Sequence, residues 1–413
     1  MKRVLSAFIS LIIILSGCMK ELRENAFSEE SLSSVINIEV GMPAGYNFDL
    51  DGVSLLLNDP VSGLSFSGKT DIDGKASIRV AHGSYSITAV VKYSEPGGLI
   101  YIFNGSANKV RVTPADANVI NVKMDLNASV SGQIVIKEAY YGGAVNPLTG
   151  KTYSNDKYVI LYNNSDEIAY LDSLCFGMTD PYNAPTAGKL SPWIKPGTTE
   201  LRDSVPAVSM AWIFPGDGDD NILRPGEEVV ISMNAIDHTT ISPNSVNLGR
   251  AGYWAVYDPI LTKGQAAPES GVKLLKCFWK VGTSNQYSFS LASPAFFIFT
   301  LGGKSPERFA QDTYTWHPNQ PERRTFDCLM IDKRLIIDGV ECFREATDSK
   351  RLRPEIDNGY AMTSGTGSGQ SVHRRMEKVI TDELGTRTLY MDTNNSTLDF
   401  EIRNWPSLKI NLL

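Results

Sequence analysis

Hydrophobic and polar residues alternate along much of the first third of the chain. Segments 36–40, 76–80, 85–91 and 120–126 place an apolar residue at every second position. Runs rich in Gly, Pro, Asn and Asp separate these segments and are typical of turns. A period of two puts one face of a strand against a core and the other face in solvent. The pattern therefore predicts an antiparallel β-domain over residues 35–127.

Residues 158–176 begin the same kind of pattern in the second part of the chain. Residues 158–162 are aromatic or branched apolar residues, residues 163–166 are the polar run Asn-Asn-Ser-Asp, and residues 168–176 are largely apolar again. We expect one hairpin of a β-sandwich here. Further short apolar strands are expected at 228–232 and 294–301.

No segment shows a long capped stripe of apolar residues at a spacing of 3.6, so long helices are not expected. The fold class predicted is all-β, with two tandem immunoglobulin-like or transthyretin-like β-sandwiches over residues 35–127 and 128–413. The second has long loop inserts, because residues 181–225 contain seven prolines and residues 302–324 contain three. Long loops in compact domains are often functional.

The inserts carry aromatic residues that are candidates for ligand binding. Exposed aromatic side chains near loop tips can anchor a partner or stack on a sugar ring, whereas the alternative is that they fold back over the ends of the sandwich. The aromatic candidates are Trp193, Trp212, Phe214, Tyr314 and Trp316. A basic patch for an anionic ligand, or simply a solvated charge cluster, is expected from Arg308, Arg323, Arg324, Lys350, Arg351 and Arg353.

The first seventeen residues have the pattern of a secretion signal. Lys2 and Arg3 precede an apolar run over 4–15, which is shorter than the roughly 20 residues that a membrane-spanning helix needs. The run ends in Leu-Ser-Gly-Cys at 15–18, which resembles the lipobox of bacterial lipoproteins. The resemblance implies cleavage before Cys18 and lipidation of that residue, with residues 18–34 as a polar tether. Several acyl chains would anchor the protein stably.

Met19 follows the cysteine, and by resemblance to Gram-negative sorting rules this implies the outer membrane, with the leaflet left open. Cleavage after residue 17 leaves 37 basic and 46 acidic residues in the mature chain, a net charge of −9. An acidic body without a long basic run excludes nucleic acid as an expected partner.

Cysteine and carboxylate residues give few signs of chemistry. Four cysteines remain after Cys18, and either a Cys328–Cys342 disulfide or buried free thiols fit their surroundings. Asp217, Asp219 and Asp220 surround a glycine and are either calcium ligands or part of a polar turn. No Gly-x-Ser-x-Gly motif and no plausible Cys–His pair occur, and no metal-ligand spacing links the histidines, so we expect a non-enzymatic protein without a cofactor other than a structural Ca²⁺.

Two groups of motifs resemble known modules. Thr70, Asp71, Gly74, Gly83 and Tyr85 match the turn and strand of carboxypeptidase-regulatory (transthyretin-like) modules. The second body resembles a lamin-tail domain through Leu161-Tyr162-Asn163, Pro225-Gly226-Glu227, Ser371 with Arg374, and Asp399-Phe400. It departs from that pattern at Ile160 and at Pro406-Ser407 and is much longer.

The whole arrangement resembles an uncharacterised family of outer-membrane lipoproteins from gut Gram-negative bacteria. That resemblance implies a ligand-binding accessory to a TonB-dependent uptake transporter, with an iron chelate as one candidate ligand. The alternative is a surface adhesin or glycan-binding lipoprotein that uses the same aromatic residues.

Overall fold

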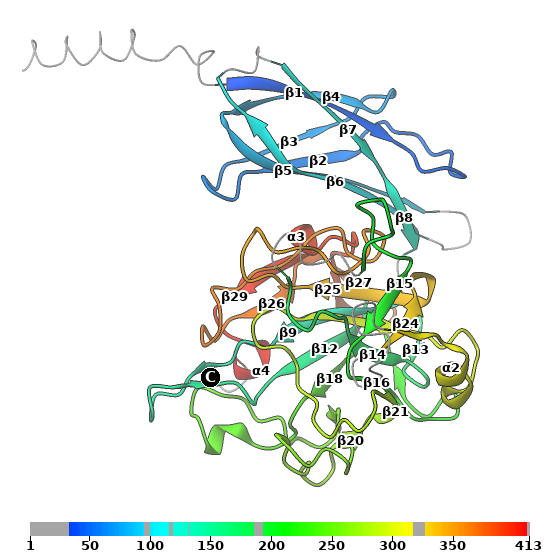
Figure 1. The fold of residues 1–413 in the computed structure, drawn as a ribbon, viewed down its shortest axis with the longest axis vertical. Helices are drawn as coiled ribbons and strands as arrows, with labels where there is room; N and C mark the ends of the chain where they lie inside the picture. Colours follow the sequence, from blue (N-terminus) through cyan, green and yellow to red (C-terminus); the bar gives the residue numbers. More distant parts are fainter. Residues whose placement is uncertain are drawn as a thin grey trace, which may run out of the picture. The chain divides into compact units, whose positions relative to one another are not determined.

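The computed structural model describes residues 33–94, 100–114, 119–130, 132–185, 193–316 and 327–410. The chain is nearly all-β, as predicted (Figure 1). It divides into two compact units, Met1–Val91 with Gly105–Asn127 and Lys92–Asn104 with Ala128–Leu413. The signal segment and Cys18 lie outside the described residues. Within the described part of the chain, no helix has the length and apolar character needed to cross a membrane.

The first eight strands form two sheets, in the orders β4-β1-β7 and β3-β2-β5-β6-β8 (Figure 1). The strands are β1 (Ser33–Gly41), β2 (Ser54–Asn58), β3 (Ser65–Lys69), β4 (Lys75–Ala81), β5 (Gly83–Ser94), β6 (Ile100–Val112), β7 (Val119–Asp125) and β8 (Asn127–Val130). Strand β1 pairs antiparallel with β4 and parallel with β7. Its alternation is confirmed, because Ile36, Ile38 and Val40 are buried while the residues between them are more exposed.

The second unit is built on two large sheets. A seven-stranded sheet has the order β20 (Lys273–Leu274), β19 (Trp254–Ala255), β18 (Glu228–Ser232), β12 (Tyr158–Asn163), β9 (Ile134–Tyr140), β26 (Ser371–Arg374), β29 (Phe400–Arg403). A five-stranded sheet has the order β21 (Lys276–Lys280), β16 (Met210–Ile213), β14 (Cys175–Met178), β22 (Ala295–Phe299), β25 (Ile336–Glu341). The predicted strands at 228–232 and 294–301 are confirmed as β18 and β22.

Smaller elements decorate these sheets. They are the three-stranded sheet of β15 (Ser204–Ala207), β24 (Cys328–Asp332) and β23 (Thr315–Trp316), and the pairs β10 (Ala144–Val145) with β11 (Thr152–Tyr153), β13 (Ala169–Tyr170) with β17 (Ile222–Leu223), and β27 (Met376–Asp382) with β28 (Gly385–Tyr390). Short helices are α2 (Pro306–Asp312), α3 (Ser396–Asp399) and α4 (Ser407–Ile410), with 3-10 turns η3 (His238–Thr240) and η5 (Lys333–Leu335).

The main core of the second unit lies between its two large sheets. Val159 and Leu161 of β12 share one hydrophobic cluster with Phe176 of β14 and Phe296 of β22. The opposite faces are also covered, since the β22 residue Phe297 packs in a separate cluster with Phe309 of α2. Burial on both faces explains why these strands read as continuous apolar runs and not as alternating ones.

The hairpin predicted at 158–176 does not form. Strand β12 pairs with β9 and β18 in the seven-stranded sheet, whereas β14 pairs with β16 and β22 in the five-stranded sheet. Between them, the short strand β13 pairs with β17. The polar residues after β12 therefore carry the chain from one sheet of the sandwich to the other. Asn163 orients the chain where it leaves β12, because its side-chain amide donates to the carbonyls of Glu167 and Leu223, both at 2.7 Å.

Cys342 is a free, buried thiol, so the expected Cys328–Cys342 disulfide is wrong and the free-thiol alternative holds for Cys342. Cys175 is likewise a buried free thiol and Cys277 is partly exposed. Burial raises the pKa of the Cys342 and Cys277 thiols to about 12, which keeps both protonated and unreactive at neutral pH.

A buried arginine joins β26 to its neighbours. The Arg374 guanidinium contacts Asp338 at 2.7 Å, Asp392 at 3.3 Å and Asp399 at 3.4 Å, and it donates to the Ile136 carbonyl at 2.9 Å. Three carboxyl groups share one cation. Burial, followed by repulsion from Asp392, outweighs the attraction of the guanidinium, and the pKa of Asp338 rises to about 7 and that of Asp399 to about 6.

Candidate functional site

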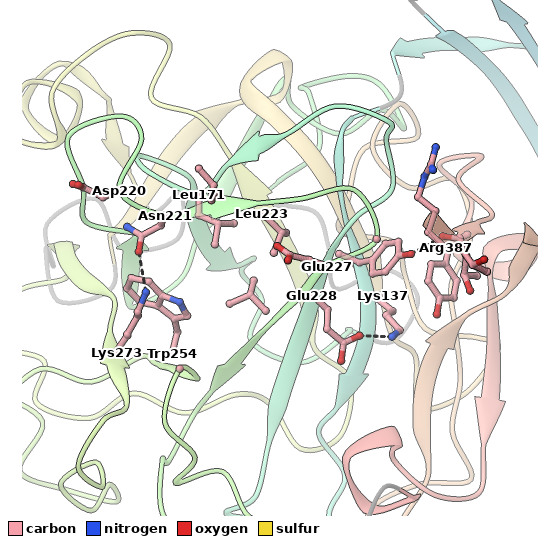
Figure 2. A pocket seen from close by; sticks show the side chains of 18 residues that line it. Lys137, Leu171, Asp220, Asn221, Leu223, Glu227, Glu228, Trp254, Lys273 and Arg387 are labelled. Carbon is pink, nitrogen blue, oxygen red and sulfur yellow. Dashed lines mark hydrogen bonds and ion pairs between the residues drawn. The ribbon is translucent and has the colours of Figure 1, made fainter. Parts of the chain in front are cut away.

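A groove of about 760 Å³ runs across neighbouring strands of the seven-stranded sheet (Figure 2). Its floor takes one side chain from each of five adjacent strands, namely Lys273 of β20, Trp254 of β19, Glu228 of β18, Tyr162 of β12 and Lys137 of β9. The β17 segment and the loop before it form one wall, and strand β28 forms another. Neighbouring strands of a sheet lie close together, so a regular scaffold positions these side chains.

Lys137 interrupts an otherwise buried strand and stands at one end of the groove. Its ammonium lies 5.5 Å from the centre of the Tyr162 ring and 5.4 Å from that of Tyr390, and it forms an ion pair with Glu228 (Figure 2). The two tyrosine rings meet edge to face at 4.9 Å. Burial alone would lower the pKa of Lys137, but the Glu228 carboxylate outweighs it and the pKa lies above its ordinary value. Lys137 is therefore charged and fixed in place.

Lys273 occupies the other end of the groove on a second aromatic ring. Its Nζ lies 5.1 Å from the Trp254 ring centre and donates to Asn221 Oδ1 at 3.2 Å (Figure 2). The amide of Asn221 is itself oriented by Asp172, to which its Nδ2 donates at 2.6 Å. Trp254 packs edge-on against Phe214 in the core at 4.8 Å, so the surface on which Lys273 rests is rigid.

The β27–β28 hairpin closes the groove through a close approach at Gly226. The Tyr162 hydroxyl donates to the Thr388 carbonyl at 2.6 Å, and the Asn164 side chain bonds to both backbone groups of Tyr390. Gly226 has a φ of +80°, and a Cβ there would lie 2.8 Å from Cβ of Arg387. A glycine is therefore required at the centre of the predicted Pro-Gly-Glu turn, both by its backbone conformation and by the hairpin beside it.

Most charged side chains that line the groove are already paired. Glu228 pairs with Lys137, Arg387 bonds to Asp382 through two contacts of 2.7 Å, and Glu227 accepts from the backbone N–H of Arg224 at 2.8 Å. The lining thus presents oriented hydrogen-bonding groups above buried aromatic rings. Such a mixture of apolar surface and a few fixed polar groups is typical of small-molecule sites.

The aromatic residues proposed from the sequence are mostly part of the interior. Trp193, Trp212 and Phe214 are at most 2% exposed, and Trp212 and Phe214 belong to the main core. The interpretation that they are exposed on loops is wrong for these three, and the alternative that the rings are buried holds. Trp212 and Phe214 fill the main core, whereas Trp193 packs against Cys328 and Met330 in a separate cluster. Tyr314 is 63% exposed, and the side chain of Trp316 lies outside the described residues. The hypothesis of an aromatic glycan platform loses three of its five members.

The predicted basic patch does not form from the described arginines. Arg351 and Arg353 are buried, Arg351 pairs with Glu341 at 2.9 Å, and Arg353 donates to the Arg202 carbonyl at 2.6 Å. Arg308 is exposed and pairs with Asp312 at 2.9 Å. Arg323 and Arg324 lie outside the described residues.

The acidic loop that contains Asp217, Asp219 and Asp220 borders the groove, which Asp220 lines. The loop is a hydrogen-bonded turn, in which Asp220 accepts from the Asp217 N–H at 2.9 Å and Asp172 accepts from the N–H groups of Gly218 and Asp220. In the described part of the chain, no three His, Cys, Asp or Glu side chains gather as metal ligands. The geometry gives the polar-turn alternative and adds nothing in favour of calcium.

Several residues that form the groove, chiefly Lys137, Trp254, Lys273 and Tyr390, were not among the candidates predicted from the sequence. One signal was available, since Lys137 and Glu138 interrupt the otherwise apolar run Ile-Val-Ile-Lys-Glu-Ala-Tyr at 134–140, and a charge within a buried strand needs a partner. The other residues come from strands of two to six residues far apart in sequence, and only the order of the strands brings them together.

The fold and part of the sequence match known proteins. The chain is 21% identical, over 89% of its length and 94% of the other chain, to a crystal structure of a DUF4876 family protein from Bacteroides thetaiotaomicron VPI-5482, with a TM-score of 0.56. BcpA, the major pilin subunit of Bacillus cereus, matches at 12% identity over 75% of this chain and 94% of that one, with a TM-score of 0.16. Comparison with curated proteins found no match. Residues 224–407, less than half of the chain, match the family described as "Protein of unknown function (DUF4876)".

Proposed function

We propose that this protein is a non-enzymatic lipoprotein of the outer membrane and that the groove described above is its ligand site. The observation that carries the proposal is the floor of the groove, where two lysines lie on buried aromatic rings and are held by Glu228 and Asn221. Fixing side chains before a ligand arrives reduces the entropy lost on binding. A volume of about 760 Å³ suits a small molecule.

The residues that line the groove favour binding over catalysis. Of the described residues there, none is a serine, cysteine or histidine, the common nucleophiles and bases. The carboxylates of the groove are already engaged, since Glu228 pairs with Lys137, Glu227 accepts from the Arg224 N–H and Asp220 accepts from the Asp217 N–H. The groove is therefore suited to holding a ligand without transforming it.

The place of action follows from the amino-terminal sequence. The signal segment and lipobox motif support cleavage before Cys18 and lipid anchoring, and Met19 supports the outer membrane. A tether of polar residues would let the body reach a partner in the membrane. The proposed partner is a TonB-dependent transporter, for which the support is the family resemblance of the sequence.

The experiment compares the mature protein with two variants of one cross-strand pair. Thr386 lines the groove, whereas its partner Thr381 on β27 does not. Thr386→Trp would fill the groove, and Thr381→Trp is the matched control. Each protein is incubated with a metabolite extract of the native cells, and the retained small molecules are identified by mass spectrometry.

We expect a molecule that is retained unchanged by the wild type and by Thr381→Trp and is lost in Thr386→Trp. Equal retention by all three proteins would show that the groove is not the site. Recovery of a chemically altered product would contradict a non-enzymatic role.

A further inference from the structure

Lys273 differs from the other cations of the groove in the kind of partner it has. Lys137 and Arg387 are each paired with a carboxylate, through Glu228 and Asp382. The contacts that hold Lys273 are the amide oxygen of Asn221 and the face of Trp254, both uncharged. Among the described residues, no carboxylate lies within ion-pair distance of its ammonium.

The arrangement around Lys273 also fixes the position of its charge. Asp172 accepts from Asn221 Nδ2 at 2.6 Å, and the Pro215 carbonyl accepts from the same nitrogen at 2.9 Å, so both amide hydrogens are engaged. The amide oxygen is thereby directed to Lys273 Nζ (Figure 2). An ammonium has three N–H donors, and Asn221 takes one of them. The two other N–H donors of the charged Lys273 ammonium remain available at a defined place in the groove.

From this geometry we infer that the ligand carries an anionic oxygen group, a carboxylate or a phosphate, which binds to Lys273. The inference rests on the proposed function, because it names the chemistry of the ligand in the same groove. A charged acceptor satisfies both remaining donors of Lys273, and a hydrogen bond between charged groups is about twice as strong as one between neutral groups. Neither Asn221 nor Trp254 would have to give up its contact with the lysine.

Glu228 indicates what lies beside the anionic group. Its Oε2 is occupied by Lys137, and its side chain is 38% exposed at the groove. A carboxylate in this position accepts hydrogen bonds and repels a second anion. The ligand therefore places its negative charge at the Lys273 end and hydroxyl or amine donors toward Glu228.

The test uses three probes that share a hydroxyl-rich ring and differ in the group at one end. Glucuronate carries a carboxylate, glucose 6-phosphate a phosphate, and glucose neither. Binding of each to the mature full-length protein is measured by titration calorimetry at low and high salt. The variant Lys273→Met keeps an unbranched side chain of similar length and removes the charge, and Lys151→Met removes an exposed lysine that does not line the groove.

We expect at least one anionic probe to bind more tightly than glucose, with an affinity that falls as salt rises. Lys273→Met should weaken that binding by about tenfold or more, the loss typical of one charge-assisted hydrogen bond, while Lys151→Met should not change it. The relative affinities of glucuronate and glucose 6-phosphate decide between carboxylate and phosphate.

Two other results are distinguishable. If the anionic probes fail to bind, or bind equally to Lys273→Met, the inference is overturned, while retention of a cell metabolite that depends on Thr386 would leave the proposed function standing. If binding of the probes and of every metabolite is independent of the groove residues, both the inference and the proposed function are refuted.

Discussion

The buried cluster around Arg374 allows a quantitative test of what holds the second unit together. The proposed change is Arg374→Met, which keeps an apolar chain of similar length and removes the guanidinium. In the wild type that group contacts three buried carboxyl groups and donates to two backbone carbonyls, those of Ile136 and Met391. It also lies 4.7 Å from the centre of the Phe400 ring. Strands β9 and β29 of the seven-stranded sheet, β25 of the five-stranded sheet and the α3 region therefore lose a common partner.

Removing one partner of a buried ion pair typically costs about 3–5 kcal/mol, because the charge left behind is desolvated without compensation. The expected loss for Arg374→Met at pH 7 is of this size, a large part of the roughly 5–15 kcal/mol that stabilises an ordinary domain. The matched control is Arg403→Met on the neighbouring strand β29. Its ion pair with Glu401 spans 2.9 Å but is more than one-third exposed, so the loss should stay below about 1 kcal/mol.

Protonation supplies the second arm of the test. The pKa of Asp338 is raised to about 7 against 3.8 for an ordinary aspartate, mainly by burial, so the folded protein holds a proton that the unfolded chain has released. This group therefore stabilises the fold at low pH, and its contribution is lost as the pH rises from about 4 through 7. Without the guanidinium, a buried carboxyl group that is ionised leaves an uncompensated charge, and protonation at pH 5 removes that charge. The loss in the free energy of unfolding caused by Arg374→Met should therefore be smaller at pH 5 than at pH 7.

The assay is urea unfolding of the wild type and both variants at pH 5 and pH 7, followed by circular dichroism and tryptophan fluorescence. A free energy of unfolding for Arg374→Met within about 1 kcal/mol of the wild-type value at pH 7 would refute this role of the cluster, because a loss of that size is typical of an exposed ion pair. A penalty that does not shrink at pH 5 would show that the cluster acts by packing and not by charge.

Three further predictions concern single residues. Trp212→Ala should lower the free energy of unfolding by about 3–5 kcal/mol because the ring is fully buried. The ligand affinity of the folded fraction should not change. A loss of binding without a loss of stability, measured by calorimetry, would show that Trp212 belongs to the ligand site. Burial, with the nearby Arg403, lowers the pKa of His373 to about 4. The contribution of neutral His373 to the stability of the fold should therefore fall as the pH drops below 6.5. An NMR titration of His373 with a midpoint near 6.5 would contradict this prediction. Cys18→Ala should release the protein from the membrane pellet and abolish labelling by radioactive palmitate, whereas retention of the variant in the pellet would argue for another anchor.

The first unit could be read from its sequence because several of its strands have one buried and one more exposed face. The alternation at Ile36, Ile38 and Val40 maps directly onto the buried face of β1. The central strands of the second unit do not show this alternation. Strand β12 is buried on both faces and reads as an apolar run, so its existence could be predicted but its partners could not. The mistaken hairpin followed from assuming that neighbours in sequence pair in space.

The candidate site was harder to predict for the same reason. Lys273 and Trp254 come from strands of two residues each, too short to show a pattern. Trp212 and Phe214 drew attention because they lie among prolines, yet composition does not tell whether an aromatic ring covers a core or meets solvent. Of the residues named from the sequence, Tyr162, Asp220 and the turn at Gly226 proved to border the groove, but none of them was identified there as part of a groove.

The pairing of β9 with β26 has a consequence for how the protein matures. The contact of Ala139 with Val372 joins positions that are 233 residues apart, near the two ends of the second unit. Because contacts between distant positions form late in folding, this unit stays incomplete until the segment around Val372 is available to β9. Until then its apolar strands lack partners and are prone to aggregate. Truncation before β26 should therefore be as damaging as deletion of β9.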